Sequence, residues 1–232
     1  MHTGLSQRLL AESLGTAFLL ATVIGSGIMA ERLAGGNLAL ALLCNTLPTG
    51  AILFVLISML GPISGAHFNP AVTGVFLLKR EMSVGAALAT IGVQCVGAFA
   101  GMLAAHLMFD EPVFQLSEKL RSGPSQWFSE WVATFGLIAA ILLTRRANPP
   151  AIPAVVGLYI TAAYWFTAST SFANPAVTLA RAFSDTFAGI RLADVPAFMA
   201  AQLLGAACAL YICRVLAGSG ETVARGEPQP AE

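Results

Sequence analysis

Charge is scarce in this sequence of 232 residues: 10% are Asp, Glu, Lys or Arg, against about 25% in an ordinary soluble domain. Hydrophobic residues make up 56%, more than a water-facing surface accommodates. This composition excludes a soluble globular enzyme and a disordered chain. Basic and acidic residues number 12 each, so the formal net charge is zero and the chain offers no basic face to nucleic acid.

Cysteine and histidine are also rare. The chain has no C-x-x-C pair, and all its cysteines lie in apolar stretches: Cys44, Cys95, Cys208 and Cys213. They are typical of small hydrophobic core residues rather than of a disulfide framework or a metal site. The three histidines form no H-E-x-x-H pattern, and no glycine-rich nucleotide motif occurs. We therefore expect no metal, no cofactor and no enzymatic activity.

Long apolar runs are abundant instead. A helix needs about 20 apolar residues to cross the bilayer core, and six segments meet this requirement: approximately 9–29, 38–60, 84–108, 127–144, 151–170 and 193–216. The first exceeds the length of a signal-peptide core and contains Glu12, so we expect it to remain as a span. A polar loop, 109–126, separates the third span from the fourth.

Two further apolar stretches, 69–79 and 174–184, are too short to cross the membrane. Lipid cannot hydrogen-bond a bare backbone, so these stretches must be re-entrant and buried against protein or water. Each would form a half-helix of about 16 Å, given the rise of about 1.5 Å per residue. Two such half-helices placed end to end would match the thickness of the membrane.

The chain contains an internal repeat. The pentapeptide Asn-Pro-Ala-Val-Thr at 69–73 recurs at 174–178, preceded by Glu12 or Glu130 and followed by Gln94 or Gln202 in the same order. Each half has three spans, an odd number, so the second half starts on the opposite side of the membrane. The halves are then related by a pseudo-two-fold axis in the membrane plane.

These observations predict an all-α membrane protein with six transmembrane helices, two re-entrant half-helices and an inverted three-helix repeat. We expect a single channel domain over 1–216, made of repeats at about 8–108 and 127–216 that loop 109–126 joins. The polar stretch 217–232, with its Gly and Pro, is predicted to be a disordered tail.

Both Asn-Pro-Ala motifs have the residues of a helix start. Asn is a preferred N-cap, and Pro suits the next position, where its missing N–H would have no partner. The motif residues are Asn69, Pro70 and Ala71, then Asn174, Pro175 and Ala176. With its oxygen committed to the cap, each Asn can present its NH2 group as a fixed donor. Beside the positive ends of two helix dipoles, a water-filled path would exclude cations and protons and admit neutral solutes.

Over roughly residues 8–216 the chain resembles the aquaporin family, the major intrinsic proteins. The resemblance lies in Ala11-Glu12, in Ser-Gly-Ala-His-Phe-Asn-Pro-Ala-Val-Thr at 64–73 and in the second Asn-Pro-Ala. It implies six tilted helices and two half-helices, one pore in each subunit, and a homotetramer. It further implies that Glu12 and Glu130 accept hydrogen bonds from the loops before the half-helices. His67 would lie near the cytoplasmic side of the pore, although an ordinary buried histidine remains an alternative.

One position departs from the family pattern. Most aquaporins have Arg directly after the second Asn-Pro-Ala, where it narrows the selectivity filter; here that residue is Val177. Arg181 lies one helical turn further on, on the same face, where it could approach the pore or serve a subunit or surface contact. Family spacing places the remaining filter positions at Thr49, at Ala162 or Ala163, and at Ser171 or Phe172.

These changes predict a filter that is wider and less polar than a water-selective one. The expected solutes are small and uncharged, such as water, glycerol and neutral metalloid hydroxides. A bacterial subgroup with the Asn-Pro-Ala-Val variation looks similar and is associated with arsenic-resistance operons, which makes arsenite and methylated arsenicals candidates. Two alternatives stay open: a water-selective aquaporin in which another side chain closes the filter, and a secondary transporter with inverted repeats.

Basic residues indicate the orientation. With both termini in the cytoplasm, seven basic residues lie inside and five lie outside or near the outer face, a weak bias. The compact pairs Lys79–Arg80 and Arg145–Arg146 both fall inside. We expect a multi-pass protein of the cell (inner) membrane, whose partners are the lipid bilayer and small neutral solutes.

Overall fold

The structure is a computed structural model and describes residues 3–217. Of the predicted tail it includes only Ala217; the rest of 217–232 lies outside the described residues. Six long helices form a bundle: α1 (Leu5–Leu33), α2 (Leu38–Ser64), α4 (Val84–Phe109), α5 (Pro124–Ala147), α6 (Ile152–Phe166) and α8 (Val195–Ala217). Single 3-10 turns, η1 (Pro149–Ala151) and η2 (Leu192–Asp194), precede α6 and α8. Counted with these turns, all six segments are long and apolar enough to cross a membrane.

Two short helices complete the fold, α3 (Pro70–Leu78) and α7 (Pro175–Arg181). Each begins directly after the Asn of an Asn-Pro-Ala motif. Across residues 3–217 every regular element is helical. The prediction of six spans and two half-helices is therefore confirmed. Its boundaries were too narrow for α1, which extends from Leu5 to Leu33, because a tilted helix continues beyond the apolar run that fills the bilayer core.

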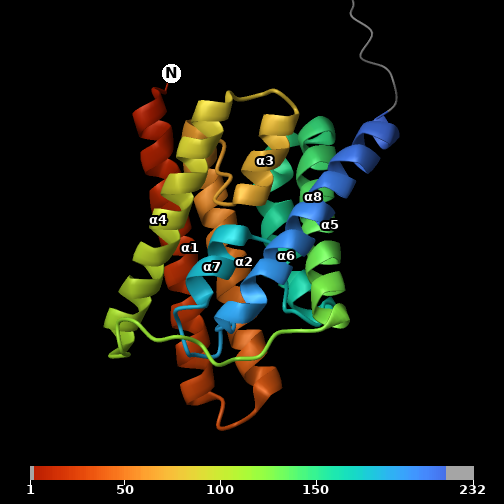
Figure 1. Ribbon diagram of the computed structural model, residues 1–232. Coiled ribbons are helices and arrows are strands. Elements are labelled where there is room, and N and C mark those ends of the chain that lie inside the picture. Colours follow the sequence, from red (N-terminus) through yellow and green to blue (C-terminus); the bar gives the residue numbers. More distant parts are fainter. Residues whose placement is uncertain (1–2, 218–232) are drawn as a thin grey trace, which may run out of the picture.

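The packing of the helices follows the internal repeat. In the first half α1 packs against α2 and α4; in the second, α5 packs against α6 and α8. The half-helices cross between the halves, so that α7 contacts α4 and α3 contacts α8. Along the axis that relates the halves, α2 meets α6 and α3 meets α7 (Figure 1). The fold is thus the inverted repeat that the sequence predicted.

Small residues allow the closest helix pairs to form. A Cβ added at Gly97 or Gly101 of α4 would collide with the backbone of α1, at Ser13 or Ala17. In the second half, a Cβ at Gly205 of α8 would likewise meet a carbonyl oxygen of α5. Equivalent glycines therefore bring equivalent backbones into contact, as is common between membrane helices.

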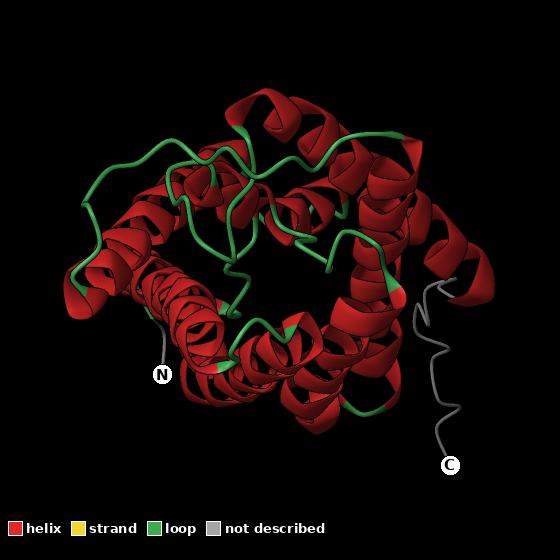
Figure 2. Cartoon of the chain, turned by 90° about the horizontal axis from the view of Figure 1, so that it is seen from below, coloured by secondary structure: helices red, strands yellow, loops and turns green. Residues whose placement is uncertain are grey.

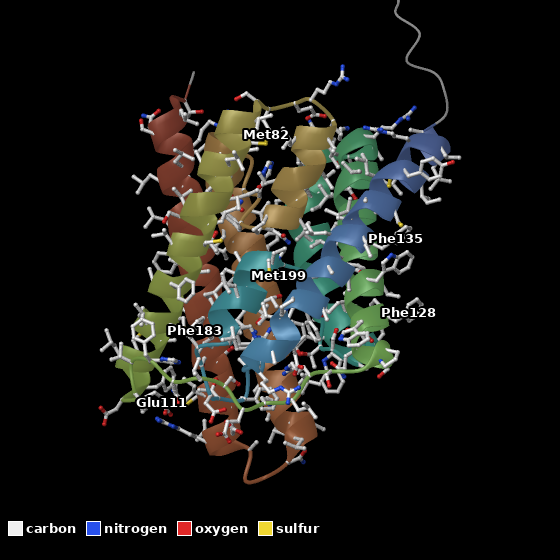
Figure 3. All side chains as sticks on the ribbon, viewed as in Figure 1. Met82, Glu111, Phe128, Phe135, Phe183 and Met199 are labelled. Carbon is white, nitrogen blue, oxygen red and sulfur yellow. The ribbon has the colours of Figure 1, made fainter. Side chains whose placement is uncertain are left out.

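The outer surface of the bundle is apolar. Phe128 and Phe135 point away from α5 in Figure 3, and the ring of Phe128 is largely exposed. The prediction that all four cysteines are core residues is wrong for Cys44 and Cys208, which lie exposed on α2 and α8. In a membrane helix an apolar residue can face lipid as readily as the core, so hydrophobicity alone does not separate the two.

The bundle has two polar ends. The first residues of α1 and the last of α8 lie at one end, which we call the N-terminal face (Figure 1). The connection from α4 to α5, residues 110–123, crosses the opposite end, which we call the loop face (Figures 1 and 2). There the backbone N–H of Ser117 donates to Ala182 O, and that of Arg191 donates to Lys119 O. These bonds fix the connection over the segment that follows α7.

Candidate functional site

The two half-helices start in the middle of the bundle, with the caps that their sequences predict. Asn69 Oδ1 accepts a hydrogen bond from the backbone N–H of Ala71 at 2.9 Å. Asn174 Oδ1 accepts the equivalent bond from Ala176 at 3.0 Å. Pro70 and Pro175 occupy the first helical positions, where no N–H is needed.

The amide groups of these asparagines also join the two halves. Asn69 Nδ2 donates to Ala173 O at 2.7 Å, and Asn174 Nδ2 donates to Phe68 O at 2.8 Å. An NH2 group has two hydrogens, so each asparagine retains one N–H for a solute. Both asparagines line the central cavity.

A buried carboxylate holds each loop that leads to a half-helix. In both halves it accepts two backbone N–H groups at 2.7–2.9 Å: Glu12 those of His67 and Phe68, and Glu130 those of Phe172 and Ala173. Phe68 and Ala173 have positive φ angles of 49° and 46°, a conformation that costs free energy for residues with a Cβ. The carboxylates thus stabilise a strained backbone.

Two glutamines brace the carboxylates in the same way. Gln94 Nε2 donates to Glu12 at 2.8 Å and to Thr73 Oγ1 at 3.0 Å. Gln202 Nε2 donates to Glu130 at 2.6 Å and contacts Thr178 of α7 at 2.8 Å. Each carboxylate within the membrane is therefore hydrogen-bonded by the loop and the glutamine that it holds in place.

One cavity of about 560 Å³ lies between the halves. Its lining includes Arg8 and Glu81 near the N-terminal face, Asn69 and Asn174 in the middle, and Arg181 toward the loop face. The cavity therefore passes the starts of both half-helices.

At the N-terminal end of the cavity lie an imidazole and an ion pair. The ring of His67 stacks on Phe76, with centroids 4.6 Å apart, and its Nδ1 lies 3.1 Å from Thr73 Oγ1. Glu81 pairs with Arg145 at 2.6 Å. Partial burial raises the pKa of the Glu81 carboxyl, but hydrogen bonds from Arg145 and Lys79 outweigh it and hold this pKa below its usual value. Glu81 is thus an anion at neutral pH.

Most of the filter residues named from the sequence line the cavity, but the one assigned to the fifth span does not. The filter residues that line the cavity are Thr49, Ser171, Phe172 and Val177. Ala162, by contrast, lies exposed on α6, and Ala163 is buried outside the lining. Successive helix residues point about 100° apart, so an error of one or two positions in the family spacing turns a side chain away.

Tyr164 takes the place assigned to Ala162. It is buried, lines the cavity, and donates from its hydroxyl to Thr49 Oγ1 at 3.3 Å. The sequence carried a signal for this: Val156, Ile160 and Tyr164 all line the cavity and recur at intervals of four, one face of a helix.

Arg181 reaches the cavity, a question that the sequence left open. Its side chain is only 2% exposed, and its Nε donates to Ala188 O. The guanidinium carbon lies 3.3 Å from the centroid of the Phe172 ring, a cation–π contact. The charged side chain of Arg181 therefore lines the loop-face half of the cavity, and Val177 lines the cavity one turn earlier on α7.

The family of the chain follows from comparison with known proteins. The family model described as Major intrinsic protein matches residues 1–171. The chain belongs to the major intrinsic protein family. This match covers the first half and the approach to the second half-helix, and the repeat extends the same architecture to α8.

Relatives of this major intrinsic protein match more than nine-tenths of its length. It is 58% identical over 212 residues to aquaglyceroporin AqpS of Rhizobium meliloti (strain 1021), and the aligned region covers 91% of each chain. It is 29% identical to the lens fiber major intrinsic protein of Gallus gallus, over 96% of this chain and 88% of that one. The X-ray structure of the aquaglyceroporin from Plasmodium falciparum superposes with a TM-score of 0.69 over 92% of this chain and 97% of that chain. At 20% identity this last likeness concerns the fold.

Proposed function

We propose that this major intrinsic protein is a passive channel for small uncharged solutes larger than water, such as glycerol. The observation that carries the proposal is the cavity itself, which passes both Asn-Pro-Ala motifs and has Val177 where most aquaporins have Arg. The spare N–H groups of Asn69 and Asn174 are donors that a hydroxyl-bearing solute can use in place of water. The name of the 58% identical relative, an aquaglyceroporin, supports the same class of solute.

Ion exclusion follows from the same geometry. Two helix starts meet near the centre, and the dipoles of the two half-helices place positive partial charge there. The two asparagines donate and do not accept at this point, since their oxygens are committed to the caps. A cation or a hydronium ion entering there would lose its hydration and gain no acceptor. We expect no proton current through the channel in a planar bilayer.

Neutral metalloid hydroxides extend the proposed solute range. Arsenite is an uncharged trihydroxide at neutral pH and resembles glycerol in size and in its hydroxyl groups. In methylated arsenicals a methyl group takes the place of a hydroxyl, and the buried Val177 beside Asn174 offers an apolar contact for it. We propose that arsenite and methylated arsenicals cross the membrane through this channel in addition to glycerol.

A water-selective channel is the second candidate, and a specific observation favours it. Tyr164 and Arg181 both line the loop-face half of the cavity, where the sequence predicted a filter that is wider and less polar than a water-selective one. Their bulk narrows this half, and the guanidinium offers water several donors.

We further propose a location and an assembly. The protein would lie in the inner membrane of the cell. Its N-terminal face carries Lys79, Arg80, Arg145 and Arg146, and by the positive-inside rule this face would be cytoplasmic. The exposed apolar helices would contact lipid and, in a homotetramer, one another.

Stopped-flow light scattering on proteoliposomes tests the proposed function. Shrinkage in an impermeant osmolyte reports water flux, and re-swelling in glycerol reports solute flux. We expect fast re-swelling whose rate rises linearly with the glycerol gradient, relative to protein-free liposomes. Fast water flux without glycerol entry would select the water channel. Saturation, or dependence on a proton or sodium gradient, would instead indicate a secondary transporter and refute a passive channel.

A further inference from the structure

Two buried arginines lie at the loop-face end of the cavity. Arg181 is 2% exposed, and Arg121, from the connection between α4 and α5, is 9% exposed. Both guanidinium groups lie against the ring of Phe172, with their carbons 3.3 Å and 4.8 Å from its centroid. Arg121 is fixed there, since its Nε donates to Gly189 O at 2.8 Å and its Nη1 to Ser169 O at 3.0 Å. Two positive charges are thus held beside one aromatic ring.

The carboxylates near these arginines bind other groups, such as Asp194, which accepts the backbone N–H of Arg121 and pairs with Arg191. Among residues 3–217 neither arginine forms a salt bridge with a carboxylate. Glu130 acts on both at longer range, but its oxygens already accept from Phe172, Ala173 and Gln202. The acid that lines the cavity within the described chain is Glu81, near the other face. A buried cation without a partner is costly, so a mobile anion would stabilise the site.

Two side chains that line the cavity carry donors without a partner among residues 3–217. The Nε of Arg181 donates to Ala188 O, whereas its two Nη groups have no hydrogen-bond partner in the described part of the chain. The hydroxyl of Ser171 is buried and also lacks a partner there. Both side chains line the cavity. Buried donors are almost always hydrogen-bonded in native proteins, so the unpartnered hydroxyl of Ser171 is unusual.

We propose that the loop-face end of the cavity is a binding site for a small oxyanion. The two Nη groups of Arg181 form the fork that binds two oxygens of a carboxylate or tetrahedral oxyanion. Ser171 Oγ donates to the same ligand, and Arg121 adds its charge from behind Phe172. The site rests on the proposed function in one respect: a bound anion occupies the solute path, so it inhibits glycerol flux from the loop face.

Inorganic sulfate is the probe, because it keeps its charge over the working pH range and does not cross lipid. Calorimetric titration of the purified protein measures binding, and glycerol re-swelling measures inhibition, with chloride at equal ionic strength as the reference. We expect saturable sulfate binding and a matching loss of glycerol flux. Arg181→Met should weaken sulfate binding by roughly tenfold or more, because it removes the charge-assisted bonds. Arg181→Lys keeps a charge without the fork and should weaken binding less.

Further variants separate loss of the site from loss of the fold. Ser171→Ala removes one donor with little change of volume and should weaken sulfate binding by roughly threefold to tenfold. Arg32→Gln is the matched control: this exposed arginine near the loop face pairs with Glu111 and lies outside the cavity lining, so sulfate binding should not change. Each variant must elute from gel filtration at the wild-type volume.

The outcomes distinguish this inference from the proposed function. Glycerol flux without saturable sulfate binding overturns the anion site and leaves the channel standing. Saturable sulfate binding without glycerol flux supports the site and overturns the proposed glycerol channel. Sulfate binding that is unchanged in correctly folded Arg181→Met and Ser171→Ala places the anion elsewhere and also overturns the inference.

Discussion

At the scale of single residues, the important feature is the displacement of a charge along α7. Val177 follows the Asn-Pro-Ala motif directly, and Arg181 lies four residues later. Four residues correspond to a rise of about 6 Å along a helix, so the guanidinium is further from Asn174 than a residue at 177 would place it. Both side chains are buried and line the cavity. The cavity therefore keeps a cation but has an apolar contact beside the half-helix start.

Val177→Arg tests the importance of that displacement. The new guanidinium would extend into the cavity beside Asn174 and would repel Arg181 one turn away. We expect glycerol permeability to fall roughly tenfold, equivalent to a barrier increase of about 1.4 kcal/mol, while water flux persists. Val177→Met, which adds length without charge, is the control and should reduce glycerol flux less. Unchanged glycerol re-swelling in Val177→Arg would refute the proposed role of position 177.

At the scale of elements, carboxylates determine the shape of the two loops. Glu130 lies on α5 but accepts hydrogen bonds from the loop before α7, and Glu12 of α1 does the same before α3. The loop residues Phe68 and Ala173 need this support because their backbones have positive φ. A long helix in each half thus positions the start of a half-helix.

Glu130→Gln should destabilise the second loop. The amide supplies one acceptor instead of two, and its NH2 group would face the backbone N–H groups that now donate. We expect a loss of about 2 kcal/mol, and so a thermal unfolding midpoint in detergent that is about 4–8 °C lower. Glu111→Gln, in an exposed pair with Arg32, should shift the midpoint far less. Equal shifts would contradict the structural role of Glu130.

Helix contacts give a second prediction at this scale: two Gly→Ala substitutions on α4 should differ in their effect on stability. A methyl group at Gly101 would collide with the α1 backbone at Ala17, whereas one at Gly92 would meet nothing within 4 Å. Gly101→Ala should therefore destabilise the protein by about 1–3 kcal/mol. Gly92→Ala should be neutral or stabilise it by up to about 1 kcal/mol, because Ala is the better helix former. Thermal unfolding in detergent measures both; a tolerated Gly101→Ala would refute the close α1–α4 contact.

At the scale of the whole molecule, one lysine on each face is held differently, although both faces carry ion pairs. On the N-terminal face Glu81 pairs with Lys79 and Arg145. On the loop face Lys119 instead donates to a carbonyl oxygen, Phe187 O, at 2.5 Å. Burial, together with the charges of Arg121 and Arg181, lowers the pKa of the Lys119 ammonium to about 8. This loop-face cation therefore titrates near pH 8.

The loop-face charge should fall as the pH rises. Lys119 is mostly protonated below its pKa and mostly neutral above it, so moving from about pH 7 to about pH 9 removes one positive charge. The other charged groups that act on Lys119 are Arg121, Arg181, Glu31 and Asp185, and a guanidinium does not lose its proton over this range. We expect sulfate inhibition of glycerol flux to weaken by roughly twofold to fivefold. Lys119→Gln should show the weaker inhibition already at neutral pH and lose this pH dependence; a variant that retains it would assign the titration to another group.

Much of this arrangement could be predicted without coordinates. The span count, the two short helices and the inversion depend on apolar run length and on the repeated Asn-Pro-Ala, which act through local chain chemistry and the thickness of the bilayer. The caps at Asn69 and Asn174 likewise involve atoms close together in sequence. These features were determined by the sequence itself, because each depends on neighbouring residues or on a length.

The lining of the cavity was decided by the tertiary structure. Tyr164 and not Ala162 lines it because α6 is rotated by its contact with α2, where a Cβ at Gly157 would meet Gly50 O. Arg181 reaches the cavity because the segment after α7 folds back and Ala188 O accepts its Nε–H. Both outcomes depend on the rotation of one helix against another and on contacts distant in the chain, which periodicity and spacing in a single sequence do not fix.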